Sequence, residues 1–167
     1  MKKKRLIFYS ITLMLFCQCP TGVMALTKSQ EEAIVERCNT IKDGLKKIQK
    51  EDARTRVYLG GYYEAILSKF IMPLNVRLVE NNLSNAGLVE NQNKFAAGRT
   101  VFANDFVAYQ QKLEELVGMD CKEKPEEFYD ELVLVRQKRK IMVQDVLKMR
   151  ALISEHLKLV DGLKGKV

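Results

Sequence analysis

The stretch FAAGRTVFANDFVAYQQKLEELVG, residues 95–118, decides the fold predicted for this chain. Its large apolar residues recur at alternating spacings of four and three, at Phe102, Phe106, Tyr109, Leu113 and Leu116. That spacing is typical of the buried seam of antiparallel helical bundles and coiled coils. We therefore expect a helix from about Leu88 to Val117, which also presents Phe95, with Gly118 as its C-terminal cap.

A second long helix is predicted on the C-terminal side of this stretch. Pro125 suits its first turn, and Glu126 and Glu127 follow where the helix dipole favours acidic side chains. Its apolar stripe consists of Phe128, Leu132, Val135, Met142, Val146, Met149, Ile153 and Val160. Residues 161–167 contain two glycines and are expected to form a frayed tail.

Helical spacing also continues on the N-terminal side. A helix is expected over residues 28–49, with Cys38 on its apolar face. Two residue pairs offer its N-terminal capping box, Thr27 with Gln30 or Ser29 with Glu32. Residues 50–54 have no apolar side chain to bury and are predicted to form a turn, the alternative being one helix that continues through them.

Residues 54–82 are predicted to form a further helix. Its apolar stripe consists of Val57, Leu59, Tyr62, Ile66, Phe70, Val76 and Val79. Pro73 should kink this helix or end it near Met72. The pair Gly60-Gly61 should allow a close backbone approach by a neighbour, and residues 81–87 should form a loop.

The predicted fold is an all-α, three- or four-helix antiparallel bundle with coiled-coil-like seams and one disulfide. No stretch alternates apolar and polar residues as a half-buried strand does. Residues 26–160 suffice for one domain with a hydrophobic core.

The first 25 residues have the pattern of a secretory signal peptide. Lys2 to Arg5 form a positive region, Leu6 to Cys17 form an apolar one, and the small residues before Leu26 suit cleavage there. An uncleaved membrane anchor is the alternative, although Gln18, Pro20 and Gly22 interrupt the apolar run. The rest of the chain is therefore expected to be secreted, periplasmic or on the cell surface.

The net charge argues against a nucleic-acid-binding protein. The whole chain carries +7, but four of its 28 basic residues lie in the signal peptide. The other 24 face 21 acidic residues, which leaves a net charge of +3 and a mixed surface.

Two cysteines remain once the signal peptide is removed. Cys38 and Cys121 form an even pair in an oxidising compartment, so we expect a disulfide between them, with two unpaired thiols as the alternative. Such a bridge closes a long loop, which the chain-entropy model values at about 4–5 kcal/mol. A metal site formed by these cysteines and His156 is less well supported, because no two of the three have ligand spacing.

No catalytic signature is present. The single histidine, His156, is expected to be solvated or to cap its helix near the frayed end. No Glu-x-x-His pair supports a di-iron site. No cofactor is expected. Five aromatic residues could line a ligand groove, but their helical spacing favours a place in the core: Tyr62, Tyr63, Phe102, Phe106 and Tyr109.

Two arginines, Arg99 and Arg139, fall on predicted apolar seams. Each either sets the register between helices or, as we favour, packs its stem on the core and exposes its charged head.

The sequence resembles small, uncharacterised secreted helical proteins of Saccharibacteria and related candidate-phyla bacteria. The resemblance is carried by residues 54–60 (RTRVYLG), 62–64 (YYE), 73–79 (PLNVRLV), 109–111 (YQQ) with 113–114 (LE), and 120–122 (DCK) followed by Pro125. It implies an exported, disulfide-bearing helical protein and no catalytic residues. Residues 26–30 (LTKSQ) also resemble one copy of the LTxxQ motif of the Spy and CpxP periplasmic proteins, which hold unfolded clients; those proteins carry the motif twice.

The expected function is that of a non-enzymatic helical binding or scaffolding protein of the cell envelope or surface. Its contacts would use a groove between helices or an exposed flank formed by Arg54, Arg56, Tyr58 and Tyr63. The partner would be an envelope or surface protein, or a second copy of the chain, and not a nucleic acid. The alternatives are a periplasmic holdase and a ligand- or metal-binding bundle.

Overall fold

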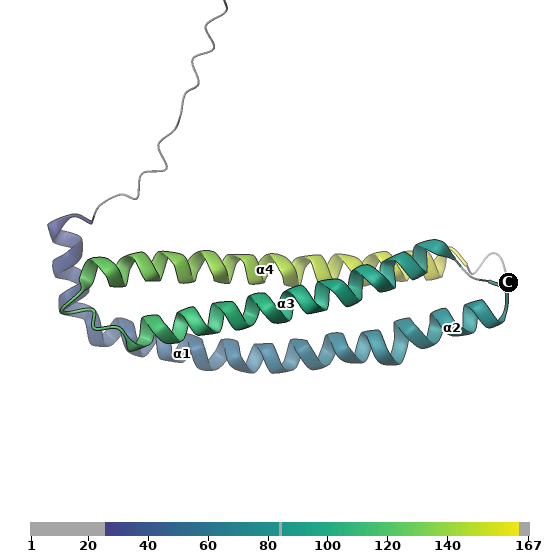
Figure 1. Ribbon diagram of the computed structural model, residues 1–167, viewed down its shortest axis with the longest axis horizontal. Helices are drawn as coiled ribbons and strands as arrows, with labels where there is room; N and C mark the ends of the chain where they lie inside the picture. Colours follow the sequence, from purple (N-terminus) through teal and green to yellow (C-terminus); the bar gives the residue numbers. More distant parts are fainter. Residues whose placement is uncertain (1–25, 84, 164–167) are drawn as a thin grey trace, which may run out of the picture.

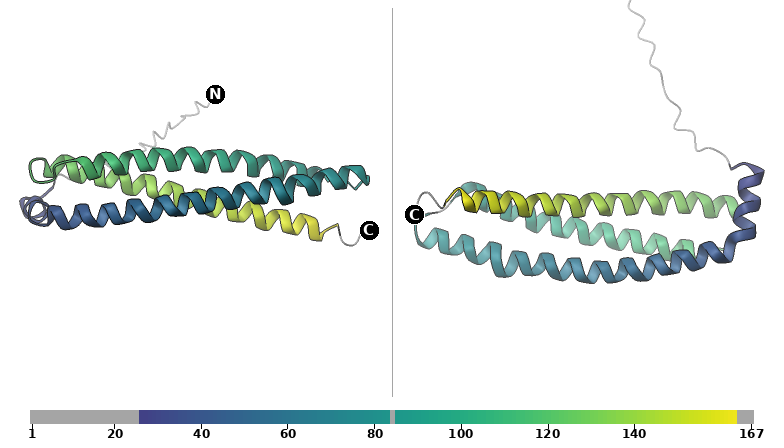
Figure 2. Two further views of the ribbon diagram at one scale, coloured as in Figure 1. Left: turned by 90° about the horizontal axis from the view of Figure 1, so that it is seen from below. Right: turned by 180° about the vertical axis from the view of Figure 1, so that it is seen from behind.

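The protein is an all-α bundle of three long helical rods (Figure 1). The computed structural model describes residues 26–83 and 85–163, and none of these forms a β-strand. The rods are, in order, α1 (Lys28–Ile66) with the π-helical turn η1 (Leu67–Ile71) and α2 (Met72–Glu80), then α3 (Ala86–Gly118), then α4 (Pro125–Asp161). Successive rods run in opposite directions, so α1 and α4 are parallel (Figures 1 and 2).

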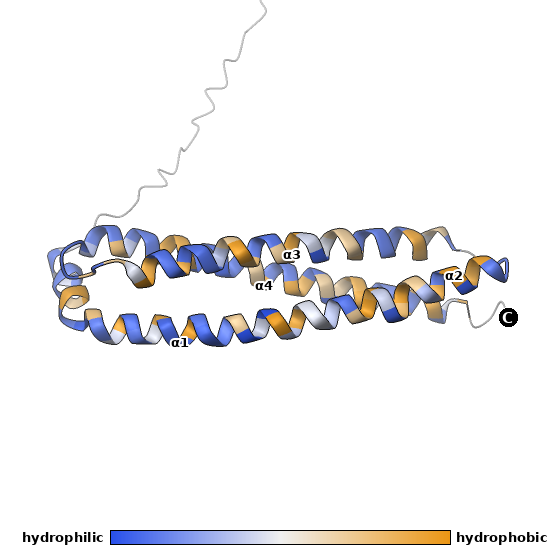
Figure 3. Ribbon diagram, turned by 60° about the horizontal axis from the view of Figure 1, so that its bottom comes forward, coloured by the Kyte–Doolittle hydropathy of each residue, from blue (hydrophilic) through white to orange (hydrophobic). Residues whose placement is uncertain are grey.

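The predicted all-α bundle is confirmed in its three-rod form. Figure 3 shows hydrophobic and hydrophilic residues mixed along every helix, as expected where each helix buries only one face. The predicted signal peptide, residues 1–25, lies outside the described residues. The same is true of residues 164–167 of the predicted tail, whereas Asp161 is the last residue of α4.

α1 begins at one of the two predicted capping boxes. The Thr27 hydroxyl accepts a hydrogen bond from the Gln30 N–H at 3.4 Å, and the Gln30 side chain accepts one from the Thr27 N–H at 2.9 Å. The two bonds satisfy N–H groups that a helix start leaves without partners.

α1 then continues through residues 50–54, so the turn predicted there is wrong and the alternative is right. The prediction looked for an apolar side chain in this segment, whereas the residue that α1 buries is Asp52. Its carboxylate accepts hydrogen bonds from Tyr109 of α3 and Arg139 of α4. A polar contact thus takes the place of an apolar one at the middle of the helix.

The apolar stripe predicted for residues 54–82 is wrong, because most of its members lie on the exposed face of the helix and a different face is buried. Its members Val57, Tyr62, Phe70, Val76 and Val79 are exposed. The buried residues recur instead at intervals of four, at Tyr63, Leu67, Ile71 and Asn75. The π turn η1 interrupts the α-helical geometry in this segment, and its wider turn brings positions four apart closer to one line along the rod.

Pro73 does not end this rod. It lies in the first turn of α2, directly after η1. A proline inside a regular α-helix lacks one N–H and collides with the carbonyl of the residue four before it. The π turn changes the backbone geometry just before Pro73, and the rod continues to Glu80 (Figure 2).

α3 supplies the centre of the core, as the opening stretch of the sequence predicts. Its seam residues are almost completely buried: Phe95, Phe102, Phe106, Tyr109, Leu113 and Leu116. The aromatic rings of this seam contact one another edge to face, with Phe102 and Phe106 centroids 6.0 Å apart.

The glycines act at other places than predicted. No atom outside their own helix lies within 4 Å of the Cβ position of Gly60 or Gly61, so this pair faces no close neighbour. The close approach is between α3 and α4, where the Cβ position of Gly98 lies 2.9 Å from Met149 Sδ. Gly118 is the last residue of α3 rather than its cap, and Met119, with an extended backbone, takes the cap position.

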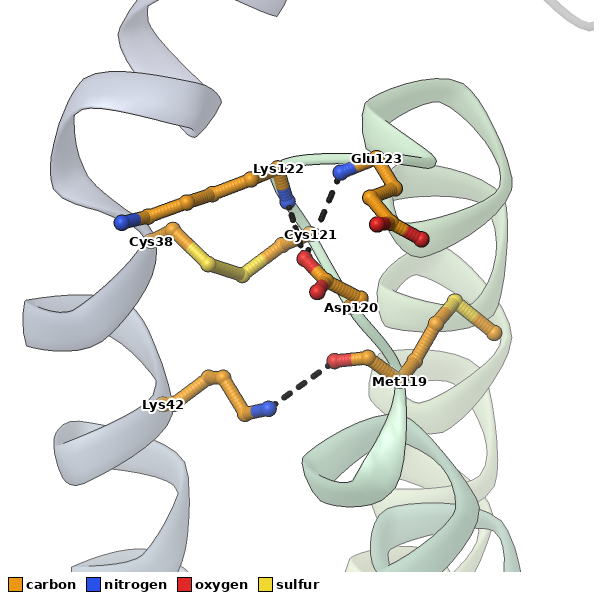
Figure 4. The surroundings of a disulfide bond; sticks show 7 residues. All are labelled: Cys38, Lys42, Met119, Asp120, Cys121, Lys122 and Glu123. Carbon is orange, nitrogen blue, oxygen red and sulfur yellow. Dashed lines mark hydrogen bonds between the residues drawn. A yellow bond between two sulfur atoms is a disulfide. The ribbon is translucent and has the colours of Figure 1, made fainter.

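The predicted Cys38–Cys121 disulfide is present (Figure 4). It joins α1 to the loop between α3 and α4, and both cysteines are buried. Nearby, the Lys42 ammonium donates a hydrogen bond to the Met119 carbonyl at 3.0 Å, so a second contact connects α1 to the same loop. The Asp120 carboxylate accepts hydrogen bonds from the N–H groups of Lys122 and Glu123, which fixes the loop itself.

Candidate binding groove between α1 and α4

The four residues predicted to form an exposed flank do not share one surface. Tyr63 is only 1% exposed and packs edge to face on Phe102. Arg54 pairs with Glu51 on α1 itself, and the Arg56 guanidinium lies over the Phe106 ring of α3. Tyr58 alone combines high exposure, 69%, with a place beside a cavity. The predicted flank is therefore replaced by a different surface.

That surface is a groove between α1 and α4, made of two adjoining cavities that share Leu59. We call the first the tyrosine lobe; it has a volume of about 320 Å³ and is lined by Tyr58, Leu59, Tyr62, Tyr63, Arg150 and Ile153. We call the second the apolar lobe; it has a volume of about 270 Å³ and is lined by Asp52, Thr55, Leu59, Phe102, Phe106, Arg139, Met142, Val143 and Val146. A groove between helices is a common place for a binding site in a bundle.

Phe102 and Phe106 of α3 contribute to the lining of the apolar lobe. Both rings are buried, as the favoured core placement predicts, and they also border the groove. That the groove binds a ligand stays a prediction. Exposed apolar residues continue outward from the lining: Tyr58 and Tyr62 on α1, and Val143, Leu147 and Leu157 on α4. Leu147 follows Val143 by four positions and Leu157 follows Ile153 by four, which places each beside a lining residue.

A polar network closes one end of the groove. The Tyr109 hydroxyl donates to Asp52 Oδ2 at 2.6 Å, and the Arg139 guanidinium donates to both Asp52 oxygens, at 2.9 and 3.1 Å. Burial, followed by the negative charge of Asp52, holds the pKa of Tyr109 far above its usual range. The bond to Asp52 likewise raises the pKa of Arg139, so the arginine stays charged. This network connects all three rods.

The Arg139 side chain is half-exposed, in keeping with the favoured prediction, but its head group is also bound to Asp52. The other seam arginine, Arg99 of α3, pairs with Glu64 of α1 on the surface. Sequence reasoning missed Asp52 itself. The signal was available, because Cys38, Leu45, Asp52 and Leu59 repeat at intervals of seven and so share one helix face.

Other chemistry is sparse in the part of the chain that the structure describes. No group of three or more His, Cys, Asp or Glu residues there could hold a metal ion, and no helix there is long and apolar enough to cross a membrane. His156, expected to be solvated or to cap its helix, is buried instead; burial lowers its pKa, and its Nδ1 has no hydrogen-bond partner in the described residues.

No family model, curated protein or solved structure matches this chain. What the groove could bind is therefore derived from its own residues.

Proposed function

We propose that this protein is an exported, non-enzymatic helical binding protein of the cell envelope or surface, and that the groove between α1 and α4 receives a helix of a partner protein. The observation that carries the proposal is the open, largely apolar groove between two parallel helices. A helix placed there would convert the three-rod bundle into a four-helix one and would cover apolar side chains that water now contacts.

The lining and its margin support a helical occupant. The half-buried Val146 supplies apolar contact area for the anchor residues of an amphipathic helix, above a floor formed by the buried Phe102 and Phe106. Tyr62, Val143 and Leu147 stand at the margin and would contact the flanks of such a helix. The Asp52 network joins the three rods at one end of the groove, so this end of the site is formed before binding, which lowers the entropic cost of association.

Site-specific cross-linking tests the proposal. A photoreactive amino acid would replace Tyr62 in the groove or, as the matched control, Val107, an exposed residue of α3 that does not line it. In native envelopes we expect one dominant adduct from position 62 and none from position 107. Equal labelling from both positions would contradict the proposal.

The same experiment separates the holdase alternative. A second apolar surface, formed around Met72, Val76, Val79 and Val89 on α2 and α3, encloses a depression of about 330 Å³. A holdase would use such dispersed apolar surfaces to hold many unfolded clients. It would therefore give a broad ladder of unrelated exported proteins, with adducts from a probe at position 76 as well as at position 62.

A further inference from the structure

The tyrosine lobe contains a positive charge that no described residue neutralises in an ion pair. Arg139, the arginine of the apolar lobe, donates to both oxygens of Asp52. Arg150, the arginine of the tyrosine lobe, forms no ion pair with any described residue. It lies on α4 facing two stacked aromatic rings of α1, Tyr58 and Tyr62, whose centroids are 6.4 Å apart.

A hydroxyl group without a partner borders the same lobe. Tyr63 is almost fully buried, yet its hydroxyl forms no hydrogen bond with any described residue. Burial raises the pKa of Tyr63, and the positive charge of Arg150 opposes that rise, so the two groups interact. Although Tyr63 is almost fully buried, its hydroxyl oxygen is not among the buried polar atoms without a partner, so water can reach it in the lobe. A ligand atom that accepts the hydrogen bond of this hydroxyl would take the place of that water.

An arginine and a neutral tyrosine hydroxyl are both hydrogen-bond donors, which together suit a carboxylate. The remainder of the groove is lined mostly by apolar residues from Leu59 to Met142. The ligand must therefore combine one anionic group, at the Arg150 end, with an apolar surface that extends toward Arg139. Between Arg139 and Ile153 the groove is about 20 Å long, at about 1.5 Å per helical residue.

Two classes of ligand combine an anionic group with an extended apolar surface. One is an amphipathic helix with an acidic residue, and the other is a single-chain anionic amphiphile. The margin of the groove favours the helix. Leu147 and Leu157 are 56% and 60% exposed beside the lining, and a thin acyl chain on the groove floor would leave them in water. A helix, about 10 Å wide with its side chains, would cover them.

We propose that Arg150 and Tyr63 form a carboxylate receptor that selects a partner helix with an Asp or Glu at one end of its apolar stripe. This inference rests on the proposed function, because it names the chemistry of the occupant of the same groove. Arg150 provides the charge, Tyr63 donates a hydrogen bond, and the apolar lobe binds the rest of the stripe.

A displayed library of helical peptides of about 16 residues, with one face randomised, provides the probe. It would be selected against the whole mature protein, and groove binders would be recognised by their loss on Val143→Lys. We expect Asp or Glu to be enriched at one position beside the apolar stripe. Arg150→Gln should weaken binding of these peptides about tenfold or more, and Tyr63→Phe should weaken it less. Arg136→Gln removes an exposed arginine of α4 that does not line the groove, and it should leave peptide binding unchanged.

The outcomes separate the inference from the function on which it rests. Groove-binding helices without an acidic preference, or equal losses from Arg150→Gln and Arg136→Gln, would overturn the receptor and leave the helix-binding function standing. A selection that yields no groove-binding helix would overturn both. A different result is that the purified protein retains a fatty acid or lipid in native mass spectrometry and loses it with Arg150→Gln. That result would show that the ligand of the groove is an anionic amphiphile and would overturn the proposal of a partner helix.

Discussion

At the scale of single residues, Asp52 connects all three rods of the bundle. It lies in a stretch with no apolar side chain to bury, and its carboxylate connects α1 to both other rods. A buried carboxylate is tolerated only when its oxygens are satisfied, and here three hydrogen bonds do so.

We expect Asp52→Ala to lower the free energy of unfolding by about 2 kcal/mol. The change leaves the buried Tyr109 hydroxyl without its acceptor and removes the two charge-assisted hydrogen bonds from Arg139. Because Arg139 is half-exposed, water can hydrate its guanidinium in the variant. Urea denaturation measures the difference. Asp43→Ala, which removes an exposed pair with Lys46, is the control and should cost less than about 0.5 kcal/mol. Similar losses in the two variants would contradict the assigned role of Asp52.

His156 gives the fold a pH dependence of defined sign. Burial lowers its pKa below the ordinary value of 6.5, so the folded protein favours the neutral imidazole. Its contribution to stability is fully present above about pH 6.5 and is lost as the pH falls through 6.5 toward the lowered folded pKa. Urea titrations near pH 7.5 and near pH 5.5 should show a larger loss for the wild type than for His156→Leu. Parallel losses in the two proteins would disprove this source of pH dependence.

At the scale of elements, the helices contact one another closely at some places and not at others. α3 and α4 approach at Gly98, whereas Gly60 and Gly61 face open space. The groove therefore lies where α1 and α4 are separated, and the tight α3–α4 pair forms its support. A helix pair can come close only where the side chains between its axes are small.

The glycines provide a matched test. Gly61→Ala should stabilise the protein by about 0.5–1 kcal/mol, because alanine is the better helix former and nothing lies within 4 Å of the new methyl group. Gly98→Ala has the same propensity gain, but its methyl group would lie 2.9 Å from the buried Met149 Sδ. We expect it to be less stable than Gly61→Ala by at least about 1 kcal/mol. Thermal and urea denaturation of both variants measure the difference in stability. Equal increases in stability would show that a methyl group fits between α3 and α4 at Gly98.

At the scale of the whole molecule, the disulfide connects the start of the first rod to the α3–α4 loop. The bridge closes a loop across 83 positions and so restricts the unfolded chain strongly. The Cys38→Ser/Cys121→Ser variant should lose up to about 4–5 kcal/mol of stability under oxidising conditions. Calorimetry would compare it with wild type before and after reduction by dithiothreitol, and the reduced wild type should resemble the variant. An unchanged melting temperature would show that the bridge does not stabilise the fold.

The whole bundle also explains why the binding residues were only partly predictable. Tyr58, Arg54, Arg56 and Tyr63 lie close together in the sequence and were expected on one flank, but successive helical residues point in different directions. Tyr63 is buried and Tyr58 is exposed as a result. Arg150, which forms no ion pair with any described residue, had no local signal because its surroundings in the groove come from α1, a distant part of the chain.

Four features could be predicted from the sequence alone: the all-α class, the buried seam of α3, a capping box at the start of α1 (as one of two residue pairs) and the cysteine pair. Each of these follows from local spacing, local hydrogen bonding or a count, which do not depend on how the helices meet. Three features could be established from the packed bundle but not from the sequence: the continuation of α1 through residues 50–54, the face of the first rod that is buried, and the position of the groove. The reason is that these features depend on contacts between distant residues, such as Asp52 with Arg139, 87 positions apart, and Tyr63 with Phe102. Helical periodicity specifies which residues share a face, but the neighbouring rods decide whether that face meets protein or water.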